Sequence, residues 1–239
     1  MRFSLTPARR RGVEFLDDPA TPAAIRDRAM ADVARSNRLF GGTRAAATAL
    51  RKLFADLPRQ ATMLDVGTGM ADIPLRTRTD ARDAGVSIAT IGADISLDIL
   101  RSARPSVDAA VCADATRLPL ADASVDVVTC SQLLHHFEAD DARAVIAELH
   151  RVSRAWVIIS DLRRSSLAAG GFWLAATALR FHPVTRHDGV VSVLRGFTPD
   201  ELENLVRDAT GVEPTIRRGV FWRVTAVWRK ATRERSVAA

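Results

Sequence analysis

The sequence predicts an α/β protein built on a mostly parallel seven-stranded sheet, with an antiparallel C-terminal hairpin and helices on both faces. Three observations support this prediction. Short apolar runs alternate with helical patterns between residues 61 and 159, as in parallel sheets whose strands are joined by helical crossovers. A glycine-rich turn follows the first run, and two closely spaced strand patterns lie near the C-terminus. The 239 residues are 47% hydrophobic and 26% charged, which excludes a disordered chain and a coiled-coil rod.

Two helices are expected before the first strand. Thr21 can cap the first helix with Pro22 in its first turn, and the helical pattern stops at a pair of glycines. The second helix carries apolar residues at helical spacing over 50–57 and ends at a proline. We therefore predict an N-terminal helical lead-in or cap over residues 1–58 and the main domain over residues 59–239.

Five apolar runs in the middle of the chain have the length of strands: residues 61–66, 86–93, 109–112, 125–130 and 156–159. Cys112 and Cys130 each lie within one of these runs, so both are predicted to be buried, reduced thiols. Two cysteines are too few for a disulfide scaffold and fit a reducing compartment.

Residues 165–179 carry no charge and are too few to cross a bilayer, which needs about 20 apolar residues. They predict a buried helix or a lid over an apolar pocket, within a lid-like insertion over about residues 163–197. Insertion into a membrane interface is the alternative. Thr198 then caps a further helix, and strand patterns at 214–218 and 221–228 predict the closing hairpin.

The formal charge of +6 is concentrated at the two ends of the chain. Residues 1–12 contain four arginines and no acid, and residues 216–239 carry a net +6, so the residues between them sum to −4. A solvated tail is the favoured interpretation; weak association with an anionic membrane surface is left open, and nucleic acid is disfavoured. Acidic residues interrupt the N-terminal stretch where a signal peptide needs its apolar core, so we expect a cytoplasmic protein.

The most informative segment is the turn after the first strand. Gly67, Thr68 and Gly69 join an apolar strand to a helix, a geometry that lets a nucleotide-type cofactor approach bare backbone amides. A dinucleotide fingerprint would need a third glycine or an alanine where Asp72 stands. The Asp72 carboxylate would repel a pyrophosphate but tolerate a ligand that carries an ammonium and a sulfonium.

Four segments occur in a fixed order: Leu-Asp-Val-Gly-Thr-Gly at 64–69, Gly-Ala-Asp-Ile-Ser at 92–96, Ala-Asp-Ala-Thr-Arg-Leu-Pro at 113–119, and a run at 125–137 that ends in Leu-His-His-Phe. With these segments the chain, from about residue 63 to 161, resembles the class I S-adenosylmethionine-dependent methyltransferases, in particular the small-molecule branch that includes the ubiquinone and menaquinone biosynthesis enzymes. The resemblance implies a Rossmann-like sheet, S-adenosyl-L-methionine as the cofactor and S-adenosyl-L-homocysteine as its product. Ala71 stands where this family usually has a third glycine.

The cofactor site is expected at the carboxyl ends of the strands. Asp94 is placed to accept hydrogen bonds from both ribose hydroxyls, and Asp114 can accept one from the adenine amino group. Ala115 offers its backbone there and Ile95 an apolar face. The complete set of predicted cofactor-binding residues is Asp65, Gly67, Thr68, Gly69, Asp72, Asp94, Ile95, Asp114, Ala115, Ser131 and Gln132.

Methyl transfer from a sulfonium mainly needs alignment in a dry site, but a hydroxyl acceptor must also lose its proton. His135 and His136 directly follow the fourth strand, and histidine is the natural base near neutral pH. Both are candidate catalytic residues, and the resemblance favours His136. No cluster of residues has the spacing of metal ligands, so no metal is predicted.

The acceptor site is expected in the parts of the chain that resemble the family least. The predicted substrate-binding residues are Asn37, Arg38, Phe40, Asp161, Arg163, Phe172 and Trp173. Because this wall is largely apolar, we predict O-methylation of a phenolic or enolic hydroxyl on a hydrophobic small molecule of polyketide or quinone type, as in secondary metabolism. C-methylation of a quinone-like ring, RNA methylation, a non-catalytic binding module and an oxidoreductase are the alternatives, and the oligomeric state stays open.

Overall fold

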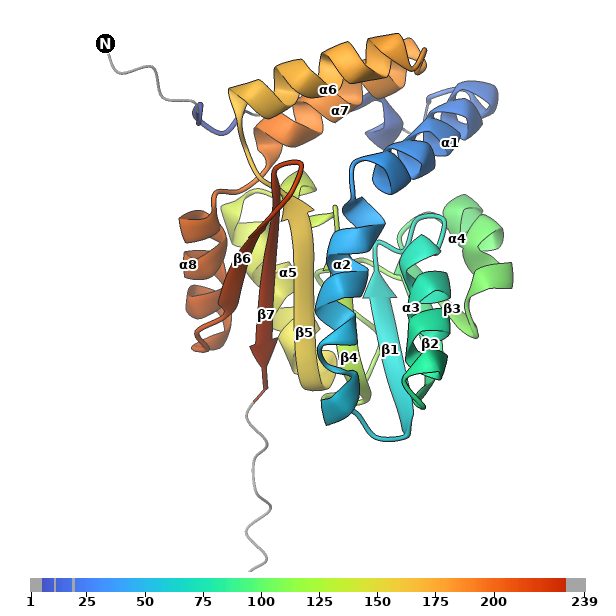
Figure 1. Cartoon of the computed structure of the whole chain (residues 1–239), viewed down its shortest axis with the longest axis vertical. Coiled ribbons are helices and arrows are strands. Elements are labelled where there is room, and N and C mark those ends of the chain that lie inside the picture. The colour runs from blue at the N-terminus through green and yellow to red at the C-terminus, as the bar shows by residue number, and fades with distance from the viewer. Residues whose placement is uncertain (1–5, 11, 19, 231–239) are drawn as a thin grey trace, which may run out of the picture.

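A seven-stranded sheet forms the centre of the molecule (Figure 1). The computed structural model describes residues 6–10, 12–18 and 20–230. The strand order is β3-β2-β1-β4-β5-β7-β6, and β7 alone runs in the direction opposite to the other six described strands. The strands are β1 (Gln60–Val66), β2 (Ser87–Asp94), β3 (Ala109–Cys112), β4 (Val125–Ser131), β5 (Ser153–Leu162), β6 (Thr215–Gly219) and β7 (Arg223–Arg229). The predicted fold class, including the C-terminal hairpin, is confirmed.

The alternation of side chains along the central strands produces two hydrophobic cores. Leu64 of β1 and Val128 of β4 point to the face covered by α5 (Ala139–Val152) and α8 (Pro199–Thr210). Met63 and Val127, each one residue earlier, point to the opposite face. Helices α2 (Gly42–Arg51) and α3 (Asp72–Asp83) cover this second face, and α4 (Leu97–Ala103) packs beside β2 and β3. Both faces are therefore covered, as the apolar strands require.

Three further helices lie beyond the carboxyl ends of the parallel strands (Figure 1). These are α1 (Ala23–Leu39), α6 (Ser166–Ala178) and α7 (Pro183–Arg195), and α7 packs against both of the others. Helix α1 begins later than predicted, because Pro22 occupies the capping position and the Thr21 hydroxyl donates instead to the carbonyl of Phe15. None of the described helices is long and apolar enough to cross a membrane.

The uncharged segment 165–179 forms α6, and of the two predictions for it, a buried helix or a lid over an apolar pocket, the buried helix is wrong. Its small residues Ala168 and Ala176 are buried, whereas Leu167, Trp173 and Leu174 are exposed. The helix thus has an inner and an outer face. Its description as part of a lid over 163–197, and the division of the chain at residue 58, stay predictions.

The two cysteines differ in burial, and the start of α8 is as expected. Cys130 is buried in β4 as predicted, but Cys112 is exposed because β3 is the edge strand of the sheet. The helix after residue 198 has the expected start: the Thr198 hydroxyl accepts from the backbone N–H of Glu201, whose carboxylate accepts from the N–H of Thr198. This reciprocal cap satisfies two backbone donors at the start of α8.

Candidate active site

The turn after β1 leaves open space beside it, but its amides are not bare as expected, because the N–H groups of Gly67, Thr68 and Gly69 all donate within the fold. Gly67 and Gly69 have φ values of +70° and +53°, a left-handed conformation that glycine adopts without strain. A side chain at Gly69 would meet no atom within 4 Å, so open space lies directly beside this part of the turn. The N–H groups of Gly67 and Thr68 both donate to the carbonyl of Ala93 in β2, which fixes the turn to the sheet. Ala71, at φ +56°, adopts the left-handed conformation that the family's third glycine would adopt more easily.

Three carboxyl groups surround this turn. Asp65 is fully buried beneath it and accepts hydrogen bonds from the hydroxyls of Thr68 and Thr129. The pKa of Asp65 is raised to about 7: burial is the largest cause, the hydrogen bonds from the two hydroxyls lower it, and the nearby charges of Asp72 and Asp94 add to the increase. Because three carboxyl groups lie at this one turn, the site fits a cationic ligand and disfavours a pyrophosphate.

Asp94 stands at the carboxyl end of β2, beside the turn. Its carboxylate accepts hydrogen bonds from the N–H of Gly69, at 3.4 Å, and of Ser96, at 3.0 Å. Burial raises the pKa of Asp94, while these backbone donors act in the opposite direction. The carboxylate borders open space, where it can also accept from hydroxyl groups of a ligand.

A cavity of about 1170 Å³ extends from this turn to α1, α6 and α7. It also reaches the N-terminal residues 14–18 and the turn between β6 and β7, where Trp222 lies. Of the residues predicted from the sequence, those that line it are Asn37, Phe40, Gly67, Thr68, Gly69, Asp72, Asp94, Ile95, Ser131, Gln132, His135, His136 and Phe172. The structure therefore brings most of the predicted cofactor and acceptor residues to one space.

Seven predicted residues do not line this cavity: Arg38, Asp65, Asp114, Ala115, Asp161, Arg163 and Trp173. The Asp114 carboxylate accepts from the N–H and hydroxyl of Thr116, in its own loop. Trp173 is 51% exposed on the outer face of α6. Asp65 and Asp161 are buried directly behind residues that do line the cavity, so each can act through a neighbour.

Asp161 holds the buried His135 in place. Its Oδ1 lies 2.7 Å from Nδ1 of His135, and its Oδ2 accepts from the backbone N–H of the same residue at 3.0 Å. Although burial raises the pKa of Asp161, the facing imidazole and the hydrogen bonds outweigh it and the pKa is lowered. An ionised carboxylate at Nδ1 selects the tautomer with its proton on that atom and leaves Nε2 as a hydrogen-bond acceptor.

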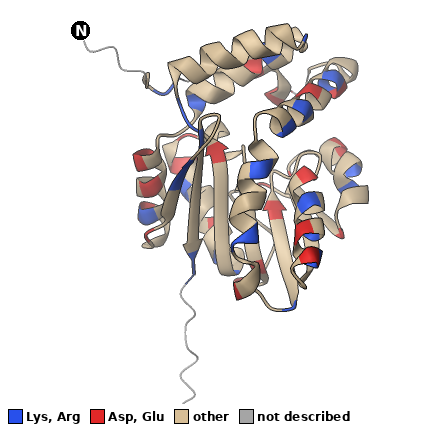
Figure 2. Cartoon of the chain, in the orientation of Figure 1, with Lys and Arg blue, Asp and Glu red and all other residues tan. Residues whose placement is uncertain are grey.

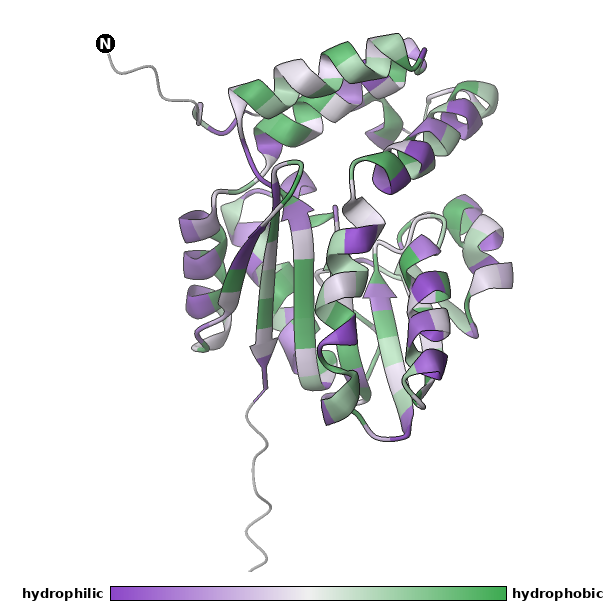
Figure 3. Ribbon diagram, viewed as in Figure 1, coloured by the Kyte–Doolittle hydropathy of each residue, from purple (hydrophilic) through white to green (hydrophobic). Residues whose placement is uncertain are grey.

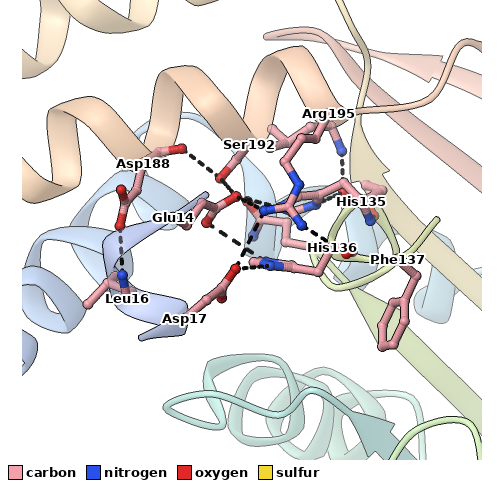
Figure 4. A network of polar contacts seen from close by, with 12 residues as sticks. Glu14, Leu16, Asp17, His135, His136, Phe137, Asp188, Ser192 and Arg195 are labelled. Atoms are coloured by element: carbon pink, nitrogen blue, oxygen red, sulfur yellow. Dashed lines mark hydrogen bonds and ion pairs between the residues drawn. The ribbon is translucent and has the colours of Figure 1, made fainter. Parts of the chain in front are cut away.

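His136 belongs to a second polar cluster, shown in Figure 4, which includes residues that the sequence did not predict. Its Nδ1 lies 3.2 Å from Asp17, and its Nε2 lies 4.0 Å from Glu14. The guanidinium of Arg195 pairs with Glu14 at 3.2 Å and donates to the carbonyl of His136. The sequence held no signal for Glu14 and Asp17, because more than a hundred residues separate them from the histidines.

Burial raises the pKa of Glu14, against the attraction of His136 and a hydrogen bond from Ser192. Glu14, His135 and His136 place ligand-type atoms within 4.8 Å of one another, the only such group among the described residues. The expectation that no metal is bound stays a prediction.

Gln132 links the exit of β4 to two other parts of the cavity wall. Its Nε2 donates to the side-chain oxygen of Asn37 in α1 at 2.8 Å, and its Oε1 accepts from the buried Arg223 of β7 at 2.5 Å. Arg223 is buried, and its guanidinium also donates to the backbone carbonyl of Phe40. The Gln132 side chain thus ties α1 and the C-terminal hairpin to the sheet.

Replacing Asp94 by alanine is expected to weaken cofactor binding by about 1 to 3 kcal/mol, since the ligand loses a charged acceptor and the N–H of Gly69 loses its partner. Isothermal titration with S-adenosylhomocysteine measures the change. Asp83→Ala, at an exposed acid at the end of α3, serves as the control and should bind as the wild type does. Equal affinities for Asp94→Ala and the wild type would contradict the predicted role.

Comparisons with known proteins agree with this arrangement. Residues 64–157 match the family model described as "Methyltransferase domain". The chain is 33% identical over 176 residues to the 27-O-demethylrifamycin SV methyltransferase of Amycolatopsis mediterranei, covering 71% of this chain and 60% of that protein. It is 35% identical over 100 residues to a ubiquinone/menaquinone biosynthesis C-methyltransferase of Desulfotalea psychrophila, covering 40% of this chain and 38% of that one. The chain thus spans three fifths or less of the length of these curated relatives.

Structures of known methyltransferases share the fold. The plantazolicin methyltransferase in complex with S-adenosylhomocysteine superposes with a TM-score of 0.66 at 12% identity, covering 91% of this chain and 93% of that one. The magnesium protoporphyrin IX methyltransferase of Synechocystis, also with bound S-adenosylhomocysteine, gives 0.56 at 16% identity and covers 83% and 87%. With the open glycine turn and the acid at the end of β2, the matched methyltransferase domain and the two relatives support a class I S-adenosylmethionine-dependent methyltransferase.

Proposed function

We propose that the chain transfers a methyl group from S-adenosylmethionine to a hydroxyl group of a hydrophobic small molecule. The single observation that carries this proposal is the buried pair of His135 and Asp161, whose imidazole borders the same cavity as the glycine turn. The relative that acts on demethylrifamycin, named for O-methylation at 33% identity, supports a hydroxyl acceptor and a role in secondary metabolism.

The residues at the turn fit the cofactor. S-adenosylmethionine supplies, when bound, a methyl group activated on a positively charged sulfur. The open space beside Gly69 can receive its amino-acid part, Asp94 can accept from ribose hydroxyls, and the Asp72 carboxylate favours a cationic ligand. The hydroxyl of Thr43 in α2 donates to Asp72 and fixes its carboxylate toward the cavity.

His135 is proposed to remove the proton of the acceptor. Its Nδ1 is occupied by Asp161, so Nε2 would take the hydroxyl proton as the acceptor oxygen replaces sulfur on the methyl carbon, with the carbon–sulfur bond broken and S-adenosylhomocysteine as the leaving group. The Asp161 carboxylate stays ionised and stabilises the imidazolium that results. Holding donor and acceptor in line in a site shielded from water supplies the remainder of the rate enhancement.

The wall opposite the sheet supports an apolar acceptor. Helix α1 contributes Met30 and Val33, and Phe40 follows it at the same wall. Phe172 of α6 packs edge-on against Phe40, with ring centres 5.9 Å apart. A planar phenolic or enolic ring of polyketide or quinone type suits these aromatic contacts. In this arrangement residues 1–58 act as a cap, and the 163–197 segment acts as a lid.

C-methylation of a quinone-like ring is the second candidate. The C-methyltransferase relative matches at 35% identity over 100 residues and favours it. The same alignment serves an electron-rich ring carbon, with His135 removing the ring proton after methyl transfer.

One experiment separates these functions. Purified protein is titrated with S-adenosylhomocysteine and then incubated with methyl-labelled S-adenosylmethionine and phenolic lipids or their methyl ethers. O-methylation predicts labelled products from the free phenols and none from the ethers, whereas C-methylation predicts a label that survives ether cleavage. Binding without transfer to any acceptor would identify a non-catalytic module, and no binding would reject the proposal.

A further inference from the structure

The outer face of α6 is apolar and open to solvent. The helix carries no charged residue over its 13 positions, as its uniform tan colour in Figure 2 shows. Leu167, Trp173 and Leu174 on this face are 55%, 51% and 63% exposed. In Figure 3 α6 is coloured mostly green to white along its length. An exposed apolar stretch of this kind marks an interaction surface.

Positive charge lies directly beside this face. Trp173 shares a groove of about 580 Å³ with Arg10, Arg186 and His187, and the remainder of its wall is mostly apolar. The Nε atom of Arg186 is buried and has no hydrogen-bond partner among the described residues. An anionic group at the mouth of the groove would give both arginines a partner.

Residues 166–195 offer no exposed acid to oppose that charge. Their single acidic residue, Asp188, is buried, and its carboxylate accepts from the backbone N–H groups of Phe15 and Leu16. His187 faces the Asp188 carboxylate at 2.8 Å, so the surface made by the outer face of α6 and this groove combines aromatic and aliphatic side chains with the charges of Arg10 and Arg186. Apolar side chains that can enter the headgroup region, with basic side chains beside them, are the two features that attach a protein to an anionic bilayer surface.

We propose that α6 and the adjoining groove dock the protein on the surface of an anionic lipid bilayer. Leu167, Trp173 and Leu174 enter the headgroup region, and Arg10 and Arg186 contact lipid phosphates. Tryptophan suits this depth because its ring is apolar and its N–H is polar. At 13 residues α6 is too short to span the bilayer and lies along it.

The docked face lies one helix away from the acceptor cavity. Ala168, Gly171 and Phe172, on the inner side of α6, line that cavity. If the acceptor is the apolar molecule of the proposed function, docking brings the cavity next to the phase in which such a molecule dissolves. The docking itself does not depend on the proposed reaction, so the two can be tested separately.

Co-sedimentation of the full chain with lipid vesicles tests the proposal, without cofactor or acceptor. Vesicles of phosphatidylcholine alone are compared with vesicles that contain phosphatidylglycerol. Wild-type protein is expected to bind the anionic vesicles at least about tenfold more tightly, with affinity falling as salt rises. The double variants Trp173→Glu/Leu174→Glu and Arg10→Glu/Arg186→Glu should each weaken binding by about tenfold or more.

Two matched controls lie on α3, away from this surface. Leu75→Glu changes a leucine that is 50% exposed, and Arg82→Glu reverses an exposed positive charge; both should bind vesicles as the wild type does. Thermal melting of every variant confirms that it is folded. The proposal would be overturned if the wild-type protein did not bind anionic vesicles. It would also be overturned if Trp173→Glu/Leu174→Glu bound them as tightly as the wild type does, because attachment would then lie at the basic termini. Loss of a dimer in that variant with unchanged vesicle binding would identify α6 as a subunit interface instead.

Discussion

Replacing His135 by alanine is expected to lower kcat by about 100- to 10,000-fold, the range that general-base catalysis contributes. The reason is geometric: His135 is buried at the cavity, and Asp161 fixes its tautomer through Nδ1 at 2.7 Å. Cofactor affinity should be unchanged, because the glycine turn and Asp94 remain intact. Single-turnover methyl transfer measures the rate, and titration with S-adenosylhomocysteine measures the affinity.

Two variants make this prediction specific. Asp161→Asn keeps the size of the side chain but removes the charge that selects the His135 tautomer, so kcat should fall and the pH profile of the rate should shift. His136→Ala should have a smaller effect, because the side chain of His136 is 26% exposed and paired with the exposed Asp17. If the His136 variant loses as much activity as the His135 variant, or neither loses any, the proposed base is wrong.

The ionisation of Asp65 is expected to make the ligand-free protein less stable as pH rises. The pKa of Asp65 is about 7 in the fold against 3.8 for the free side chain. Between these values the unfolded chain has lost the proton that the folded chain keeps, so the free energy of unfolding falls with increasing pH. Below about pH 4 both states are protonated, and above about pH 7 both are ionised, so the loss is confined to this window and amounts to about 4 kcal/mol.

Comparison with Asp65→Asn isolates this contribution from that of other groups. Asparagine keeps the shape of the side chain and cannot ionise, so the stability of the wild type relative to the variant should fall by about 3 kcal/mol between about pH 5 and pH 8. Urea unfolding at several pH values measures both proteins. A difference that stays constant across this range would show that Asp65 is ionised throughout.

The parts of the structure that depend on local sequence were predictable. The strands follow from apolar runs. The open turn follows from Gly67 and Gly69, because both have positive φ values, which residues with a side chain rarely adopt. Asp94 and His135 could be placed at one sheet edge because both directly follow strands, and the carboxyl ends of parallel strands share an edge.

The parts that depend on long-range packing were not predictable. Glu14 reaches the histidines only because the N-terminal segment lies across α7, where Asp188 accepts from its backbone. The outward position of Trp173 depends on which side of α6 packs on α7, and a helix without charges carries no pattern that distinguishes its two sides. Cys112 is exposed because β3 is the edge strand of the sheet. The order of the strands, not the composition of β3, determines that position.

The position of Trp222 at the cavity wall has a practical consequence. The chain has no tyrosine and four tryptophans, so its ultraviolet emission comes from indole rings alone. Trp156 and Trp228 lie in strands and Trp173 on the outside of α6, which leaves Trp222 as the one indole that borders the cavity within the described residues. A Trp222→Phe variant therefore identifies the part of the fluorescence signal that reports ligand entry, and binding can be followed without an attached dye.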